Sequence, residues 1–255
     1  VELGAVGRAE ILDVPSFFVA EDLGVEVGDP RSFQDDVVLL VDAEGDDPTR
    51  LADQQQLHIG VGGHRAHVRG AGEAARGVAQ ARKALAGLDR VVNIVGASSW
   101  SPLLDLDEQT WERDFAMNLK HHWYVARSAA LSWIDAGQPG VLCVVGSISG
   151  AFSSANHGAY GAAKAGVVNF TGFLNAEFSG GELRASVVIP GEVDTPILEG
   201  RPVVPNAEAR ATMVTSEDVA EAITLIARLP QKSNIPELTI RPTAVRDVSQ
   251  ETKFA

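Results

Sequence analysis

Short apolar segments of strand length alternate with helical segments from about residue 66 onwards, and this alternation limits the possible folds more than any other feature. The apolar segments are continuous and rich in β-branched residues, which is typical of strands buried on both faces. Such strands, separated by helices, predict an α/β fold: a doubly wound parallel sheet with helices on both faces. The predicted strands cover 88–95, 140–145, 185–189 and 237–241, and the predicted helices cover 71–86, 108–136, 158–178 and 216–229.

The first 65 residues follow this pattern less clearly. Residues 1–60 contain 14 acidic and 3 basic residues, a net charge of −11, whereas the other 195 residues contain 20 and 18, a net charge of −2. No repeat or long linker divides the chain, so we expect one domain over 1–255 whose segment 1–65 is divergent and acidic. Candidate strands in this segment are 9–14, 37–42 and 66–69, and 48–57 is a candidate helix.

Composition excludes several classes of function. The net charge of −13 argues against a nucleic-acid partner, because phosphate binding needs clustered basic residues. No apolar stretch is long enough to predict a membrane span, and the first residues do not resemble a secretory signal. The single cysteine, Cys143, excludes an internal disulfide and a cysteine-based zinc site and favours a reducing, cytoplasmic location. His121 and His122 lack a carboxylate at metal-ligand spacing, so we expect them to pack and predict no metal site.

One pair of residues indicates proton-transfer chemistry. Tyr160 and Lys164 are four residues apart in the predicted helix 158–178, so their side chains share a face. A neighbouring ammonium group favours the phenolate, which predicts that the pKa of Tyr160 falls from near 10 towards neutral pH. A tyrosine of this kind can act as a general acid and base.

Three further features strengthen this interpretation. Ser147 follows the predicted strand 140–145, at the sheet edge where ligands bind in such folds. Asn118 lies inside a predicted helix, where asparagine is unfavourable without a structural or functional reason. A turn with a hydroxyl group at Thr195 follows the predicted strand 185–189 at the same edge.

Together these residues resemble the short-chain dehydrogenase/reductase family, in family order and spacing over residues 66–245. The resemblance implies a Rossmann-like fold in which Tyr160 exchanges a proton with an alcohol or carbonyl oxygen and Ser147 hydrogen-bonds that oxygen. It implies that Lys164 holds the nicotinamide ribose and lowers the pKa of the tyrosine, and that Asn118 shapes a helix kink that binds a relay water. The matching motifs are Asn93-Ile-Val-Gly96, Asn118, Ser147-Ile-Ser-Gly150, Tyr160-Gly-Ala-Ala-Lys164 and Pro190-Gly-Glu-Val-Asp-Thr195.

The resemblance also implies an NAD(P) cofactor. In the family, an acid at the end of the second strand binds the adenosine ribose; Asp42 takes that place here and favours NAD over NADP. Asn93 would brace neighbouring strands, and Thr195 would touch the nicotinamide carboxamide. The residues expected on the cofactor side are Asp42, Asn93, Gly96, Pro190, Gly191 and Thr195.

The glycine-rich turn of the family, Thr-Gly-x-x-x-Gly-x-Gly, does not occur in this chain. Its glycines let the backbone approach the pyrophosphate, whereas residues 15–22 read Pro-Ser-Phe-Phe-Val-Ala-Glu-Asp. The family Asn-Asn-Ala-Gly has also become Asn-Ile-Val-Gly, so that Ile94 and Val95 add bulk beside the cofactor path. Both departures affect the cofactor half, and we therefore consider that this chain binds no cofactor itself.

Three functions follow from these observations. We favour a non-cofactor-binding subunit of an oligomeric, tetrameric oxidoreductase that acts on hydroxyacyl-CoA, 3-oxoacyl or similar carbonyl and alcohol substrates, with a homologous subunit as its partner. The second is an active NAD(P)-dependent alcohol dehydrogenase or ketoreductase that assembles with itself and uses Ser147, Tyr160 and Lys164. The third is a small-molecule sensor on the same scaffold. His157 and two arginines of the expected substrate lid, Arg201 and Arg210, are further candidates for ligand contact.

Overall fold

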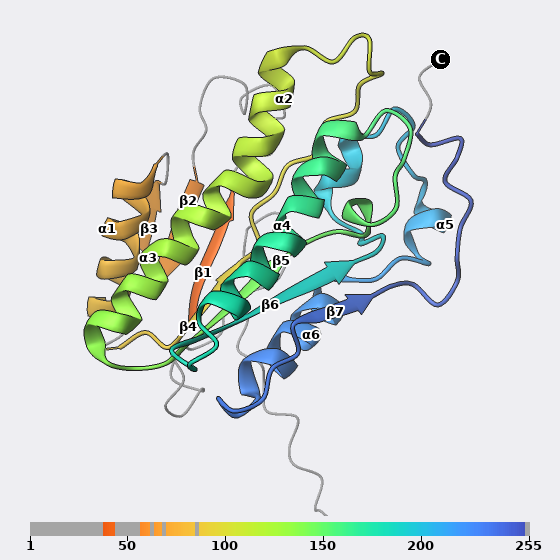
Figure 1. Cartoon of the computed structure of the whole chain (residues 1–255). Helices are drawn as coiled ribbons and strands as arrows, with labels where there is room; N and C mark the ends of the chain where they lie inside the picture. The colour runs from red at the N-terminus through yellow and green to blue at the C-terminus, as the bar shows by residue number, and fades with distance from the viewer. Residues whose placement is uncertain (1–37, 44–56, 62–63, 68–69, 85–86, 253–255) are drawn as a thin grey trace, which may run out of the picture.

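The computed structural model describes residues 38–43, 57–61, 64–67, 70–84 and 87–252 (Figure 1). Its strands form one sheet in the order β3-β2-β1-β4-β5-β6-β7. The predicted doubly wound α/β fold is confirmed, because the strands that carry the expected site follow one another through this sheet with helices between them. The strands are β1 (Val38–Ala43), β2 (Leu57–Val61), β3 (His64–His67), β4 (Arg90–Asn93), β5 (Gly140–Val145), β6 (Leu183–Pro190) and β7 (Glu237–Ile240).

The sheet is not parallel throughout. β1, β4, β5, β6 and β7 run parallel to one another. β2 runs antiparallel to β1, and β3 antiparallel to β2, so the two form a hairpin at the sheet edge. The hairpin arises because only residues 62–63 separate β2 from β3, and a crossover to a parallel strand needs a dozen residues or more. The prediction of a helix over 48–57 is wrong at Leu57, which begins β2.

The position of β1 also differs from expectation. The sequence predicts residues 37–42 as the second strand of the fold. In the structure β1 pairs directly with β4, with Val41 opposite Asn93. In a sheet of this order, the strand in the place of β1 is the one whose following turn receives the pyrophosphate. Asp42 therefore lies near the end of the strand that pairs with β4.

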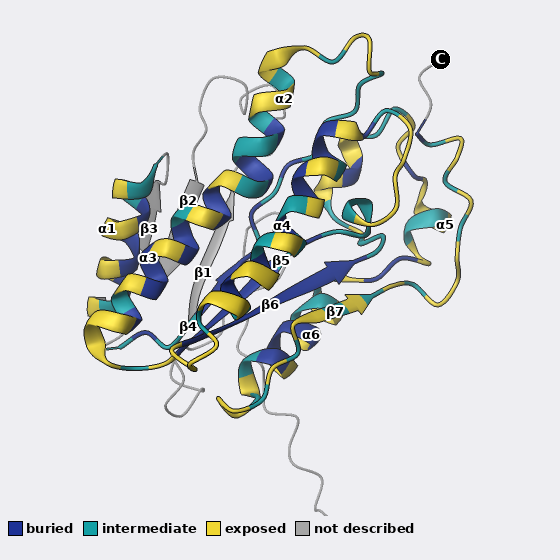
Figure 2. Ribbon diagram, viewed as in Figure 1, coloured by how far each residue is buried: buried dark blue, intermediate teal, exposed yellow. Residues whose placement is uncertain are grey.

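Helices cover both faces of the sheet, as Figures 1 and 2 show. On one face α1, α3 and α4 enclose the larger core, in which Trp133, Leu142 and Val187 are wholly buried. On the other face α6 packs Ile223 and Ile226 against the sheet. The helices are α1 (Ala71–Ala84), α2 (Glu108–Phe115), α3 (His121–Ala136), α4 (Gly158–Glu177), α5 (Ala207–Arg210) and α6 (Ser216–Arg228).

The segment predicted as one helix over 108–136 is continuous but changes its winding. Between α2 and α3 a π-helical turn, η4 (Ala116–Lys120), inserts an extra residue into the helix. Trp111 and Trp123 do not belong to the buried face of this segment, since both are exposed. The buried face is offset from them and includes Asn118, Val125 and Trp133.

Local sequence signals define several other boundaries. The Thr215 hydroxyl and the Asp218 carboxylate form the capping box that begins α6. Gly137, in the left-handed conformation, ends α3. Short 3₁₀ turns, η5 (Ile148–Gly150) and η6 (Pro196–Gly200), follow β5 and β6. The candidate strand 9–14, residues 15–22 and most of the candidate helix 48–57 lie outside the described residues.

Gly140 begins β5 beneath the buried indole of Trp133, which donates a hydrogen bond from Nε1 to the Leu88 carbonyl at 2.8 Å. A Cβ atom at Gly140 would lie 1.9 Å from a ring carbon of Trp133. We expect Gly140→Ala to lower the free energy of unfolding by about 3 kcal/mol, because the indole has no space into which to move. Chemical denaturation measures the change. The matched control is Gly87→Ala, which meets no atom within 4 Å and should change stability by less than about 0.5 kcal/mol.

Candidate active site

The four residues predicted to transfer a proton lie at the carboxyl edge of the sheet. Ser147 lies two residues after the end of β5 and accepts a hydrogen bond from the Ser149 backbone at the start of η5. Tyr160 and Lys164 lie one turn apart on α4, and both are buried. Asn118 is wholly buried in the π-helical turn. The fold thus brings the ends of three elements to one place, and the loop after β4 adjoins Asn118.

Asn118 joins the long helix to the loop after β4. Its Oδ1 accepts a hydrogen bond from the Ala97 backbone at 3.2 Å, and its Nδ2 donates to the Ala97 carbonyl at 2.7 Å. Nδ2 also donates to the Asp114 carbonyl at 2.9 Å. The π-turn confirms the predicted departure from regular helix at this residue. Its physical basis is that the amide turns inward and replaces backbone pairing with bonds to the loop.

Lys164 is 2% exposed, and its Nζ donates to the Val145 carbonyl at 2.9 Å. Burial in this apolar surrounding lowers the pKa of the ammonium to about 8. A Cβ atom at Gly96 would lie 3.1 Å from Nζ and 2.9 Å from the Asn118 oxygen. Gly96 therefore leaves open the space in which these two polar groups meet.

The predicted lowering of the pKa of Tyr160 is wrong for this structure. Burial of the phenol raises its pKa to about 12, the nearby Ser147 hydroxyl opposes the rise, and the Asp114 carboxylate adds to it. The Lys164 ammonium lies 5.7 Å from the ring centroid and does not offset burial. The desolvation of the phenolate therefore outweighs the cation that the sequence places one turn away.

Asp114 is a site residue that the sequence did not reveal. It is wholly buried one turn before Asn118, and its Oδ2 accepts a hydrogen bond from the Ser99 hydroxyl. Its Oδ1 has no partner among the described residues. Burial raises the pKa of this carboxyl, and the bond from Ser99 only partly compensates. Only its four-residue spacing from Asn118 could have indicated that an acid lies on the site's face of the helix.

Two of the predicted cofactor residues are Asn93, which ends β4, and Gly96, which lies in the loop after it. Asn93 is wholly buried, and its Oδ1 bonds to Nε2 of His121 at 2.8 Å. Asn93 thus links β4 to the helix that crosses it, and the expectation that it braces neighbouring strands stays a prediction. His121 fills the space above β4, and burial lowers the pKa of its ring to about 3, so it is uncharged.

Three further predicted cofactor residues, Pro190, Gly191 and Thr195, lie at the end of β6 and beyond. The Gly191 backbone donates to the Ile240 carbonyl, which joins Pro190-Gly191 to the end of β7. Thr195 precedes η6, and its side chain makes no capping bond there. The side chain of Asp42 lies outside the description, so its predicted contact with a ribose stays a prediction.

The arginines of the expected lid are not free to bind a ligand. Arg201 bonds to Glu192 at 2.9 Å and to Glu251 at 2.6 Å, and Arg246 contacts the same two carboxylates. Arg210 pairs with two acids of its own, at positions 194 and 199. The expectation that Arg201 and Arg210 meet a ligand's acid group is therefore not supported. The ion pairs of Arg201 and Arg246 with Glu192 and Glu251 instead hold the C-terminal segment against the lid.

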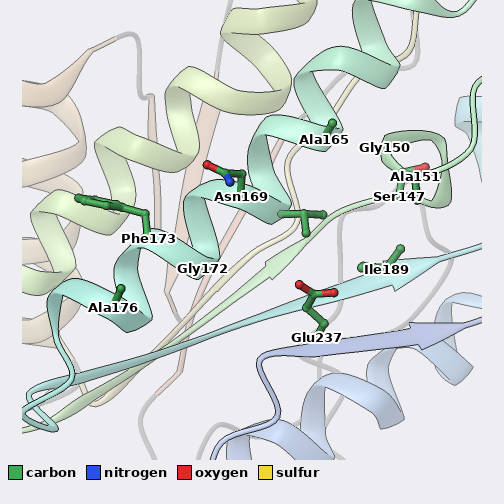
Figure 3. Close-up of a pocket in the computed structure, with 11 residues that line it drawn as sticks. Ser147, Gly150, Ala151, Ala165, Asn169, Gly172, Phe173, Ala176, Ile189 and Glu237 are labelled. Atoms are coloured by element: carbon green, nitrogen blue, oxygen red, sulfur yellow. The ribbon is translucent and has the colours of Figure 1, made fainter.

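A groove of about 590 Å³ lies beside the site, between the outer face of α4 and the sheet edge formed by β6 and β7 (Figure 3). Ser147 lies at one end. Asn169 and Phe173 line it from the helix, and Ile189 and Glu237 line it from the strands. Small residues on this side of α4 keep the helix surface flat, so the groove remains open along the helix.

The remaining candidates have structural roles. His122 is buried beside His121, which confirms that both rings pack in the interior. Cys143 is buried in β5, and burial raises the pKa of its thiol to about 12, as expected of a core residue. Within the described part of the chain, no group of three or more histidines, cysteines and acids is placed to hold a metal. No described helix is long and apolar enough to cross a membrane.

Comparisons with known proteins agree on one family. The family model described as short chain dehydrogenase matches residues 23–202. A cis-4-hydroxycyclohexanecarboxylate dehydrogenase of Sinomonas cyclohexanicum is 35% identical over 54% of this chain, and the match spans 57% of that relative. An inactive 2-(S)-hydroxypropyl-CoM dehydrogenase 2 of Xanthobacter autotrophicus is 32% identical over 72% of this chain and 84% of its own length. An alcohol dehydrogenase structure from Thermococcus sibiricus, complexed with 5-hydroxy-NADP, has a TM-score of 0.62 at 21% identity and covers 72% of this chain and 75% of its own.

The buried Asp114 makes stability depend on pH. Because its pKa is higher in the folded chain than the ordinary 3.8, its contribution is fully present below about pH 3.8 and is lost as the pH rises through the folded value. We expect Asp114→Asn, which keeps an acceptor for Ser99, to be more stable than the parent at pH 7 by about 1 kcal/mol and to lose this advantage towards pH 4. Urea denaturation at both pH values measures this. An equal difference at both pH values would show that folding does not raise the pKa of Asp114.

Proposed function

The chain belongs to the short-chain dehydrogenase family of oxidoreductases, and we propose that it is a subunit of an oligomeric dehydrogenase that does not hold the dinucleotide itself. In this proposal Ser147 and Tyr160 still hydrogen-bond the oxygen of an alcohol or carbonyl compound. The hydride is transferred in a homologous subunit that has the glycine-rich turn. One observation carries the proposal: the sequence that follows β1 is unsuited to a pyrophosphate.

Such folds receive the pyrophosphate at the turn after the strand that stands in the place of β1. After β1 the sequence reads Glu44-Gly-Asp-Asp-Pro48, with three acids and one glycine. Side chains prevent the close backbone approach that glycines permit. The carboxylates would also repel two phosphate groups, at about 1 kcal/mol per pair near the surface. The residues present therefore do not fit the phosphate half of a dinucleotide.

The nicotinamide half fits better. Lys164 has one described hydrogen-bond acceptor for the three donors of its ammonium, and Gly96 leaves open the space beside it. These features suit a ribose hydroxyl or another polar ligand group at this point. A site that suits only one end of the cofactor supports the retention of a ligand pocket without retention of hydride transfer.

The chain's own residues can still act on a substrate oxygen. The phenol of Tyr160 is uncharged at neutral pH, because its pKa is about 12. It can therefore donate a hydrogen bond to a carbonyl or alcohol oxygen, together with the hydroxyl of Ser147. The two relatives named above are a dehydrogenase of a hydroxy-substituted carboxylate and an inactive dehydrogenase of a hydroxypropyl compound. We therefore propose a small hydroxy or oxo compound as the ligand. An acyl-CoA would need a cation other than the paired Arg201 and Arg210.

Exposed apolar surface supports a partner subunit. Trp123, Leu131 and Ile134 on α3 and Phe173 on α4 are between two and three fifths buried, although they lie on helices whose opposite faces form the core. Apolar side chains exposed in this way are typical of subunit contacts. Beside Phe173, the groove along α4 offers small residues against which another helix can pack.

The second candidate function is an active dehydrogenase of the same family. It is favoured by the complete set of Ser147, Tyr160, Lys164 and Asn118, of which Asn118 stands in the π-turn with every polar atom of its amide bonded. This candidate requires a cofactor to bind without the family turn, so cofactor binding separates the two functions.

Calorimetric titration of the isolated chain with NAD and with NADP tests the proposal. We expect no heat of binding and no rise in melting temperature at millimolar cofactor, because the pyrophosphate has no cradle. We also expect the chain to co-purify with a homologue that has the glycine-rich turn, when both are expressed together. A saturable heat of binding that Lys164→Ala abolishes would assign cofactor binding to this chain and favour the second candidate.

Tyr160→Phe tests whether this chain turns over substrate. In the assembled oligomer we expect the rate of substrate oxidation per oligomer to stay within about twofold of the parent, because the reacting site lies in the partner subunit. In an active enzyme the same change would remove the general acid and lower kcat by roughly 10²–10⁴-fold. Tyr124→Phe, which changes a tyrosine away from the site, is the matched control.

A further inference from the structure

Three aromatic rings form a continuous stack that ends on Tyr160. The ring of His157 lies 4.4 Å from that of Tyr160, centroid to centroid, with 12° between their planes. The indole of Trp100 covers His157 at 3.8 Å and 8°. The rings come from two separate segments, since Trp100 lies in the loop after β4 and the other two lie at the start of α4.

The middle ring of the stack is fixed in place and uncharged. Nε2 of His157 lies 2.7 Å from the Ser98 hydroxyl, two residues before Trp100. Its Nδ1 is buried and has no partner among the described residues. Burial, and to a smaller extent the charge of Arg201, lower the pKa of the ring to about 4, so it is neutral at pH 7. A neutral imidazole can lie flat against the phenol without placing a charge on it.

The backbone on both sides of the stack is also anchored. The Ser101 backbone donates to the Asn156 carbonyl at 2.7 Å, which joins the loop after β4 to the residue before His157. Asn156 has a positive φ of 62°, a left-handed conformation that asparagine tolerates better than most residues. Its Nδ2 donates to the Thr252 carbonyl at 2.8 Å, and this bond adds the C-terminal segment to the same junction.

We propose that His157 is a positioning residue for Tyr160: stacked between the indole of Trp100 and the phenol, and bonded to Ser98, it fixes the plane and direction of the phenol ring. Hydrogen bonds to the hydroxyl of Tyr160 cannot fix the plane of the ring by themselves, because such a bond leaves the ring free to turn about its own axis. A flat neighbour on one face prevents both this rotation and a swing of the side chain. The proposal rests on the proposed role of Tyr160 in holding a substrate oxygen, and it assigns the orientation of that hydroxyl to a residue outside the four.

The chain allows this to be tested on one tyrosine. It contains two, Tyr124 and Tyr160, so in a Tyr124→Phe background every tyrosine signal belongs to Tyr160. Carbon-13 NMR of the labelled ring at pH 7 reports the rate of ring rotation. Phenolate absorbance at pH 11, with circular dichroism to verify the fold, reports the ionised fraction. Neither readout needs cofactor or turnover, so failure of this proposal is distinguishable from failure of the proposed function.

In the parent background we expect slow ring rotation and about a tenth of Tyr160 ionised at pH 11, given its pKa of about 12. His157→Ala should give fast rotation and an ionised fraction of roughly nine tenths, because the exposed phenol then approaches its ordinary pKa near 10. His157→Phe restores the flat neighbour and should restore both values. His157→Leu restores burial without a flat ring, so it should restore the ionised fraction but not slow rotation.

Two results would overturn the proposal. Unchanged rotation in His157→Ala would show that other contacts hold the phenol. Equal restoration by Leu and Phe would show that His157 only fills space. If His157→Ala does not fold, the comparison of Leu with Phe decides alone, since both keep the volume of the side chain. Ser98→Ala, which removes only the hydrogen bond to His157, should increase the rotation rate by less than His157→Leu does.

Discussion

The pair of hydrogen bonds between the Asn118 amide and the Ala97 backbone determines the arrangement of the site. These bonds hold the long helix in a π-turn against the loop after β4. The π-turn places Asp114 beneath Ser99 in that loop and directs the start of α3 over β4. The same loop continues to Ser98 and Trp100, which hold His157 and through it Tyr160. Loss of Asn118 would therefore disturb not only the helix that carries it but also the residues at the start of α4.

Burial is the second constraint, and it acts in opposite directions on the ionisable groups of the site. It raises the pKa of Tyr160 and of Asp114 and lowers that of Lys164, because each charged form loses its hydration. The site as it stands favours an uncharged phenol, which suits hydrogen bonding to a ligand oxygen. Proton abstraction by the phenolate would require a further stabilising charge. This electrostatic state and the acidic sequence after β1 support the same function, a ligand-holding subunit.

The two halves of the site differ in how far the sequence could predict them. The motif residues Ser147, Tyr160 and Asn118 converge because strand ends and helix starts meet at one edge of a parallel sheet. The cofactor side was predicted less well. Asn93 bonds to His121 across the sheet–helix contact, a pairing between residues 28 apart that no periodicity reveals. Residues 37–42 were assigned to the wrong place in the sheet, because an apolar segment does not encode its neighbours.

The sequence by itself determined the strands and helices from residue 71 onwards, the family resemblance and the four residues that meet at the sheet edge. Short-range patterns suffice for these, since periodicity, capping residues and motif spacing act over a few residues. Tertiary structure decided the position of β1 beside β4, the antiparallel hairpin at the edge and the burial of Asp114. It also decided the stack on Tyr160 and the direction in which the pKa of that tyrosine moves. Each of these depends on contacts between distant segments, and burial has no local signature in the sequence.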